Sequence, residues 1–99
     1  MKKIVLLCAA GMSTSMLVQK MREYAAQIGY ECQVDAYPIA DAKRVAADAD
    51  IALLGPQVRF KQKQVESEVS CPVEPIDMTA YGMMDGAKVI NHVKEVLGE

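Results

Sequence analysis

Two short, uninterrupted apolar runs constrain the fold of this chain more than any other feature. Residues 4–8 read Ile-Val-Leu-Leu-Cys, and residues 51–54 read Ile-Ala-Leu-Leu. Both runs are too short for an ordinary helix and lead into a segment that contains glycine, which is typical of a strand buried on both faces. Such strands occur in parallel sheets that carry helices on both faces. We therefore expect the two runs to be the central strands of a parallel sheet.

Two weaker segments are predicted to be edge strands. Residues 31–36 alternate between polar and apolar side chains, as in a strand exposed on one face. Residues 73–76 contain Pro75, which cannot donate a ladder hydrogen bond and is tolerated mainly at a sheet edge.

Apolar stripes at helical spacing occupy the intervals between these strands. Gly29 is expected to end the first helix, and Asp85 is expected to cap the start of the last. Strands that alternate with helices predict a single-domain α/β fold, with an open four-stranded parallel sheet of order 2-1-3-4 and helices on both faces. The stripes lie within residues 17–28, 39–49, 58–69 and 89–97.

This strand order predicts a site at the carboxyl ends of the first and third strands. The connections that follow these two adjacent strands diverge, and ligands of open α/β sheets bind in the crevice at such a point. Residues 8–15 and 55–57 fall there, so topology alone brings Cys8 into the predicted site.

Size, charge and cysteine usage exclude several classes of protein. A chain of 99 residues has room for one compact domain, and its net charge of −2 gives no reason to expect nucleic-acid binding. The longest apolar run, residues 4–10, is far shorter than the ~20 residues of a membrane-spanning helix, and no convincing signal-peptide cleavage site follows it. Cys8, Cys32 and Cys71 form neither a CxxC pair nor a metal-ligand spacing. We expect a cytoplasmic protein with reduced thiols and without a metal or other cofactor.

The segment after Cys8 has the residues of an anion-binding loop. Small residues lead from the strand into the start of a helix, where unpaired backbone N–H groups and the helix dipole favour a phosphate group. Gly11 permits unusual backbone angles, and three hydroxyl side chains add donors. A cysteine beside such a loop is expected to attack phosphorus as a thiolate, which makes Cys8 the candidate catalytic residue. The candidate phosphate-binding residues are Ala9, Ala10, Gly11, Met12, Ser13, Thr14 and Ser15.

Three interpretations of this loop remain open from the residues alone. The first is a phosphoryl carrier. The second is a small cysteine phosphatase, although Thr14 stands where the arginine of a Cys-x5-Arg motif would clamp the phosphoryl group. The third is a regulatory module that senses an anion without covalent chemistry. The chain lacks the GxxxxGK[ST] and GxGxxG motifs and a second cysteine near Cys8, which excludes a P-loop, a dinucleotide site and a thioredoxin-type site.

The loop and two later segments resemble a known family. Residues 8–18, Cys-Ala-Ala-Gly-Met-Ser-Thr-Ser-Met-Leu-Val, resemble the active-site segment of enzyme IIB in the lactose/cellobiose class of the bacterial phosphotransferase system (PTS), and more closely its cellobiose/chitobiose branch. Residues 53–58 resemble that family's third strand and following loop, and residues 81–86 resemble the segment before its last helix. The resemblance implies a single IIB domain over residues 1–99, similar in fold to the low-molecular-weight cysteine phosphatases.

The resemblance also implies a phosphoryl relay. A phosphohistidine on the partner protein IIA would donate its phosphoryl group to Cys8, and phosphocysteine would pass it to a sugar bound in the membrane permease IIC. The implied sugar is a β-linked disaccharide such as cellobiose or chitobiose. We expect a monomer that docks transiently at the inner face of the cell membrane.

Residues outside the loop receive structural interpretations first. Asp85 is expected to be a helix cap, with closure of the site or the general acid of a phosphatase as the alternatives, and His92 is expected to be a surface side chain outside the crevice. Met12 is a candidate for docking IIA or IIC, since exposed methionines suit adaptable partner surfaces. Gln57 is expected to be a solvated loop residue, with a contact to phosphate or partner as the alternative. The cations within residues 59–63 are expected to form a solvated face, with steering of an acidic partner as the alternative.

Overall fold

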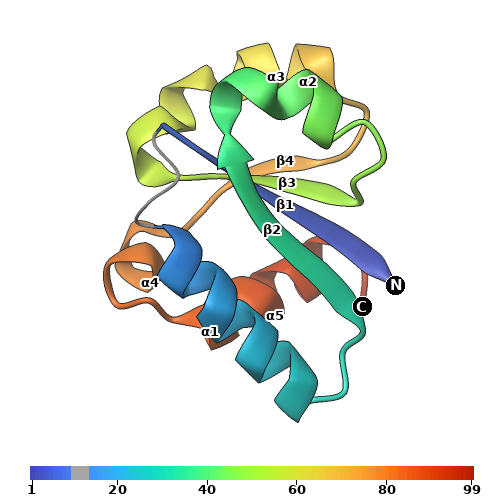
Figure 1. Cartoon of the computed structure of the whole chain (residues 1–99), viewed down its shortest axis with the longest axis vertical. Helices are drawn as coiled ribbons and strands as arrows, with labels where there is room; N and C mark the ends of the chain where they lie inside the picture. The colour runs from blue at the N-terminus through green and yellow to red at the C-terminus, as the bar shows by residue number, and fades with distance from the viewer. Residues whose placement is uncertain (10–13) are drawn as a thin grey trace.

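The computed structural model describes residues 1–9 and 14–99, which form a four-stranded parallel sheet between two layers of helices (Figure 1). The order of the strands in the sheet is β2-β1-β3-β4. The predicted order and the predicted α/β class are therefore confirmed. The strands are β1 (Lys2–Cys8), β2 (Cys32–Pro38), β3 (Ile51–Leu54) and β4 (Val73–Pro75).

Strand β1 is central because both of its edges are paired. Its seven residues pair with β2 along their whole length, and its residues 4–7 pair with β3. Strand β4 pairs only with β3, and its last residue, Pro75, lies opposite Leu54. The proline therefore occupies an edge strand, where its missing N–H removes no hydrogen bond from the interior of the sheet.

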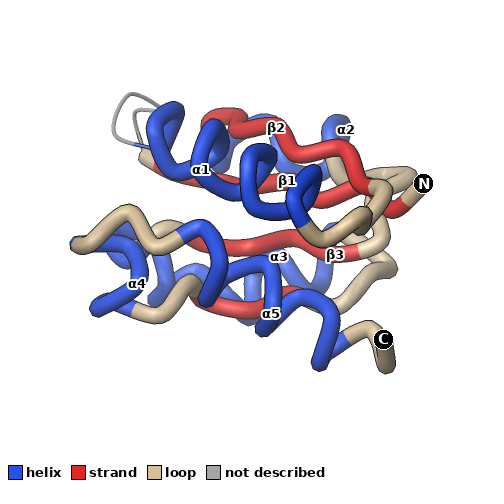
Figure 2. Tube along the Cα trace, turned by 90° about the horizontal axis from the view of Figure 1, so that it is seen from below, coloured by secondary structure: helices blue, strands red, loops and turns tan. Residues whose placement is uncertain are grey.

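Two helical layers cover the sheet, as Figure 1 and Figure 2 show from two directions. One layer contains α1 (Thr14–Gln27), α4 (Met78–Gly82) and α5 (Gly86–Val96). The other contains two 3-10 helices, η1 (Ile39–Asp41) and η2 (Pro56–Lys61), together with α2 (Ala42–Val45) and α3 (Gln62–Glu68).

The central strand contributes side chains to both layers because neighbouring residues on a strand point to opposite faces. Ile4 and Leu6 pack in the core that includes α1 and α5, whereas Val5 and Leu7 pack in the core that includes α2 and α3. All four side chains are fully buried. By the same alternation, Cys8 falls on the α1 side of the sheet.

Helices α1 and α5 approach each other closely at Gly86. A Cβ atom at this glycine would lie 2.4 Å from the carbonyl carbon of Lys20 and 2.5 Å from the backbone nitrogen of Met21. Real Cβ atoms essentially never come within 3.0 Å of a heavy atom from another part of the chain. Only glycine therefore permits this approach, which sets the position of α1 against α5.

The link between α4 and α5 is built from helix-ending and helix-starting contacts. Met84 has a φ of 53°, in the left-handed region that residues other than glycine rarely adopt. The N–H groups of Met84 and Asp85 donate to the carbonyl oxygens of Tyr81 and Ala80 at 3.2 and 2.8 Å, which is the Schellman pattern at a helix end. The carboxylate of Asp85 accepts a hydrogen bond from the N–H of Lys88 at 3.1 Å, so the predicted cap is confirmed.

The helices depart from the prediction in three respects. Gly29, with a φ of 70°, ends α1 as predicted, but Ile28 is 41% exposed because it lies beyond the last helical residue, Gln27. The second and third predicted helices both begin as 3-10 turns, which leaves α-helices of only 4 and 7 residues. The five-residue helix α4 was not predicted, because it is too short to show a helical period.

Both ends of the chain lie at the amino end of β1 (Figure 1). The ammonium group of Lys2 is 3.8 Å from the carboxylate of Glu99, and the hydroxyl of Tyr30 donates to the same carboxylate at 2.6 Å. Lys3 pairs with Asp48 at 2.6 Å in this region. The site is predicted at the opposite, carboxyl ends of the strands.

Candidate active site

Cys8 is the last residue of β1 and lies between the ends of the two neighbouring strands. It is opposite Pro38 of β2, and the preceding Leu7 pairs with both Tyr37 and Leu54. The thiol therefore stands at the point where the strand order reverses, as topology predicted. Only 3% of Cys8 is exposed, so the residue is covered by the segments around it.

Two polar groups contact the sulfur atom of Cys8 in the described part of the chain. Its Sγ is 3.3 Å from Oγ1 of Thr14, which is the first residue of α1 and is completely buried. Its Sγ also lies 3.8 Å from the carbonyl oxygen of Tyr37. The hydroxyl can donate to a thiolate, whereas the carbonyl can only accept from the protonated thiol. Thr14, a predicted phosphate-binding residue, is thus in direct contact with the candidate nucleophile.

The first residue of helix α1 contacts this sulfur atom. The helix has 14 residues and carries no acidic side chain in its first turn. The backbone N–H groups and the dipole at such a helix start stabilise negative charge. Ser15, also predicted to bind phosphate, is exposed in this first turn, as is Met16. The arrangement can hold an anion next to the thiol.

The rest of the predicted phosphate loop is described only in part. Ala9 directly follows β1 and is exposed. Ala10, Gly11, Met12 and Ser13 lie outside the described residues, so the roles assigned to them from the sequence stay predictions.

Gly55 and Gln57 lie on the β3 side of the thiol. The N–H of Gly55 donates to the carbonyl oxygen of Leu7 at 2.8 Å, which continues the pairing of β3 with β1. A Cβ atom at Gly55 would lie 3.6 Å from Cβ of Cys8 and 3.3 Å from Oε1 of Gln57. Gln57 is exposed, as expected, and its amide oxygen lies beside Gly55. A large side chain at position 55 would crowd the thiol.

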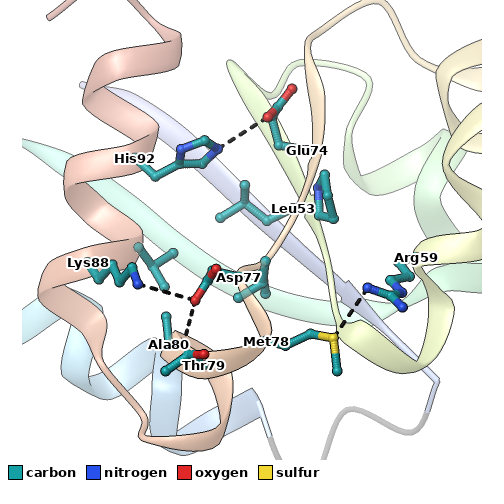
Figure 3. Close-up of a pocket in the computed structure, with 12 residues that line it drawn as sticks. Leu53, Arg59, Glu74, Asp77, Met78, Thr79, Ala80, Lys88 and His92 are labelled. Atoms are coloured by element: carbon teal, nitrogen blue, oxygen red, sulfur yellow. Dashed lines mark hydrogen bonds and ion pairs between the residues drawn. The ribbon is translucent and has the colours of Figure 1, made fainter.

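A hollow of about 500 Å³ lies beside β4, and Cys8 is not among its lining residues. One ion pair and one histidine–carboxylate contact lie in it (Figure 3). Nζ of Lys88 is 3.4 Å from the carboxylate of Asp77, and Nε2 of His92 is 3.2 Å from the carboxylate of Glu74. His92 is an exposed side chain on α5, as predicted, but its partner was missed. The sequence feature that could have indicated this pairing is Glu74, a charged residue within a short strand, which pairs in register with buried Leu53.

Asp77 has a second function at the edge of this hollow, as the cap of α4. The N–H of Ala80 donates to its carboxylate at 2.9 Å. This hydrogen bond and the neighbouring ammonium group of Lys88 hold the pKa of Asp77 below its ordinary value of 3.8.

The other two cysteines lie toward the amino end of the sheet. Cys32 pairs with Lys2, and Cys71 precedes β4. Both thiols are free and half-buried, and burial raises the pKa of each. Within residues 1–9 and 14–99, no group of three or more His, Cys, Asp or Glu side chains could hold a metal ion. In the same residues, no helix is both long enough and apolar enough to cross a membrane.

Comparison with known proteins gives matches over nearly the whole chain. Residues 3–92 match the family model of the lactose/cellobiose-specific IIB subunit of the PTS. The oligo-beta-mannoside-specific EIIB component of Bacillus subtilis (strain 168) is 48% identical over 91 residues, which cover 89% of this chain and 88% of that protein. The galactose-specific EIIB component of Lactococcus lactis subsp. cremoris (strain MG1363) and the cellobiose-specific EIIB component of Lactococcus lactis subsp. lactis (strain IL1403) are each 42% identical over 97 residues, with 90% of both chains covered.

Two solved structures show the same architecture. The cellobiose-specific IIB component from Borrelia burgdorferi matches 91% of this chain and 85% of its own, with a TM-score of 0.74 and 37% identity. The lactose-specific IIB domain from Streptococcus pneumoniae covers 95% of both chains with a TM-score of 0.84 at 17% identity, which shows a shared fold. From the family model and these relatives, the chain belongs to the lactose/cellobiose-specific IIB family and is a phosphotransferase of the sugar PTS.

Proposed function

We propose that Cys8 carries a phosphoryl group from a phosphohistidine of the IIA protein to a sugar bound by the IIC permease. The observation that supports this proposal most directly is the contact of 3.3 Å between Sγ of Cys8 and Oγ1 of buried Thr14, at the start of α1. A nucleophile, a hydroxyl donor and the positive end of a helix are thereby brought together at one edge of the sheet. A residue that accepts a phosphoryl group needs these groups around it.

The first transfer exchanges a phosphorus–nitrogen bond for a phosphorus–sulfur bond. The thiolate of Cys8 attacks phosphorus, and the imidazole of the donor leaves with the bonding electron pair and takes up a proton. The hydroxyl of Thr14, which contacts the attacking sulfur, would donate to a phosphoryl oxygen once the new bond has formed. The helix start stabilises the negative charge that arrives with the group.

The second transfer reverses the roles of the sulfur. A sugar hydroxyl attacks phosphorus, loses its proton to a base outside this chain, and displaces the thiolate of Cys8. The hydroxyl of Thr14 is then close to the departing sulfur and can donate to its negative charge. The same contact therefore serves both half-reactions.

The contacts of Thr14 and Asp85 argue against hydrolysis as the main activity. Thr14 occupies the position at which a cysteine phosphatase would have its arginine clamp. Asp85, the carboxylate that could serve as a general acid, is held by the N–H of Lys88 as the cap of α5. With Thr14 in place of that arginine and Asp85 engaged as a cap, phosphocysteine would persist long enough to be handed on.

We propose a β-linked disaccharide such as cellobiose or chitobiose as the sugar. Two similar proteins are named for oligo-beta-mannoside and cellobiose, which supports a β-linked substrate, while a third is named for galactose. We further propose that residues 1–99 act as one IIB domain, in monomeric form, and that the domain meets IIC at the inner face of the membrane.

Intact-mass spectrometry tests the carrier role directly. The chain is incubated with phosphoenolpyruvate, the general PTS proteins and a IIA protein of the lactose/cellobiose class. We expect one phosphoryl adduct on the wild type and on Cys32→Ala, a control thiol at the other end of the sheet. Cys8→Ala should show none. An adduct that survives in Cys8→Ala would mean that another residue is phosphorylated, and steady release of phosphate would favour a phosphatase.

A further inference from the structure

Helix η2 and the start of α4 carry apolar and cationic side chains near the hollow, and Arg59 and Met78 line it. Helix η2 contributes Arg59, Phe60 and Lys61, and the start of α4 contributes Met78; we call these four residues the η2–α4 surface. Phe60 is 77% exposed and Met78 is 58% exposed. Nη1 of Arg59 lies 3.3 Å from Sδ of Met78, so the two elements meet beside the hollow (Figure 3).

The hollow next to this surface has room for an apolar side chain. Its volume of about 500 Å³ lies within the range of protein ligand pockets, and Leu53, Ile76 and Val89 supply apolar lining. A single exposed apolar residue is ordinary on a protein surface. Here Met78 and Arg59 line a partly apolar hollow, and exposed Phe60 follows Arg59 on η2, which is the composition of a site that anchors a partner's side chain.

No carboxylate of residues 1–9 or 14–99 forms an ion pair with the cations of this surface. In the hollow, Lys88 and His92 each have a carboxylate partner. Arg59 also lines the hollow, and among the described residues its guanidinium contacts the sulfur of Met78 and no carboxylate. Lys61 likewise contacts the ring of Phe60, with Nζ 6.0 Å from the ring centroid. The complementary surface on a partner is therefore acidic.

Helix η2 also begins beside Cys8. Helix η2 starts at Pro56, directly after Gly55, and a Cβ atom at Gly55 would lie 3.6 Å from Cβ of Cys8. A protein that is bound to η2 therefore stands next to the candidate nucleophile.

We propose that the η2–α4 surface docks the IIA donor, which presents an acidic side chain to Arg59 and an apolar side chain to the hollow. This inference rests on the proposed carrier function. Charge decides between the two partners of the relay. Cytoplasmic loops of membrane proteins carry an excess of Lys and Arg, so Arg59 and Lys61 would repel the loops of a permease. A soluble donor is under no such constraint.

The test separates the two half-reactions. The first rate is phosphoryl transfer from phosphorylated IIA to this chain, followed by intact mass at IIA concentrations below saturation. The second is transfer from the phosphorylated chain to cellobiose in membrane vesicles that contain IIC. The variants are Arg59→Glu and Phe60→Ala, with Lys43→Glu as the control, because Lys43 is an exposed cation on α2, outside the η2–α4 surface.

We expect Arg59→Glu to lower the first rate about tenfold at low ionic strength, with a smaller effect as salt is added. Phe60→Ala should lower it without the salt dependence. Both variants should leave the second rate unchanged, and Lys43→Glu should change neither rate.

Unchanged donor rates in both variants would overturn the proposal. A loss confined to the permease step, or an equal loss in both steps, would also overturn it, because the surface would then not belong to the donor. If the wild-type chain accepts no phosphoryl group from IIA, the proposed function fails, and this inference fails with it.

Discussion

Replacing Gly86 with alanine should force α1 and α5 apart. A Cβ atom at this position would meet three backbone atoms of α1: the carbonyl carbon and oxygen of Lys20 at 2.4 and 2.6 Å, and the nitrogen of Met21 at 2.5 Å. Backbone atoms cannot turn aside as the end of a flexible side chain can. Carbon atoms in ordinary contact are at least about 3.5 Å apart, so one helix must move by about 1 Å.

The stability that Gly86→Ala loses can be worked out from the packing of α1 against α5. Overpacking of a well-packed core costs roughly 1–3 kcal/mol. Alanine is a better helix former than glycine by at most about 1 kcal/mol in a helix interior, and Gly86 is only the first residue of α5. We therefore expect a loss of about 2 kcal/mol in the free energy of unfolding. For a chain of this size that corresponds to a fall in melting temperature of roughly 8–16 °C.

Urea and thermal unfolding, followed by circular dichroism, measure this loss. The matched control is Gly82→Ala at the end of α4, since a Cβ atom there would have no atom within 4 Å. Its stability should change by less than about 0.5 kcal/mol. A Gly86→Ala chain as stable as the wild type would refute the argument, because it would show that the helices can separate at no cost.

Three further predictions concern the thiols and the acid stability of the chain. Thr14→Val should slow phosphoryl acceptance by roughly 10- to 100-fold, because a hydrogen bond to a charged group contributes about 1.5–3 kcal/mol. In the same mass assay Thr14→Ser should retain most of the rate, and equal rates for Thr14→Val and the wild type would contradict the role of the hydroxyl. Because the pKa of Asp77 is lowered in the folded chain, its carboxylate stabilises the fold at pH values above its ordinary pKa of 3.8, and this stability is lost as the pH falls through the folded pKa. Asp77→Asn keeps a capping group, so its urea midpoint should drop less on acidification than that of the wild type, and an identical drop would count against the cap. Burial raises the pKa of Cys32 and Cys71, so both should react with iodoacetamide more slowly in the folded chain than in urea at the same pH, which peptide mass mapping can check; equal rates would show that burial does not protect them.

The sheet and the place of the thiol could be predicted because both depend on local patterns. An apolar run such as residues 51–54 can only be buried on both faces, which makes it a central strand. The order of the strands then places the carboxyl end of β1 at the point where the order reverses. Cys8 therefore lies there whichever side chains contact it. The contact with Thr14 was not predicted in detail, because it depends on how α1 packs over the strand.

The edge of the sheet near β4 could not be predicted in the same way. Helix α4 is defined by the cap at Asp77 and by the left-handed backbone of Met84, and neither leaves a periodic trace in the sequence. The pairing of His92 with Glu74 joins residues 18 apart on different elements and depends on the position of α5 over the sheet. The hollow is a product of these tertiary relations, so its residues carry no common motif.

The contact between Lys2 and Glu99 has a practical consequence for engineering. Because the two termini meet at the amino end of β1, a tag or a neighbouring domain attached at either end would extend away from Cys8, which lies at the other end of that strand. A linker of a few residues could join the ends, and new ends could be opened in an exposed loop elsewhere, as circular permutation requires. Such a rearranged chain should still present its thiol to visiting partners, which makes this fold suitable as a module within a larger polypeptide.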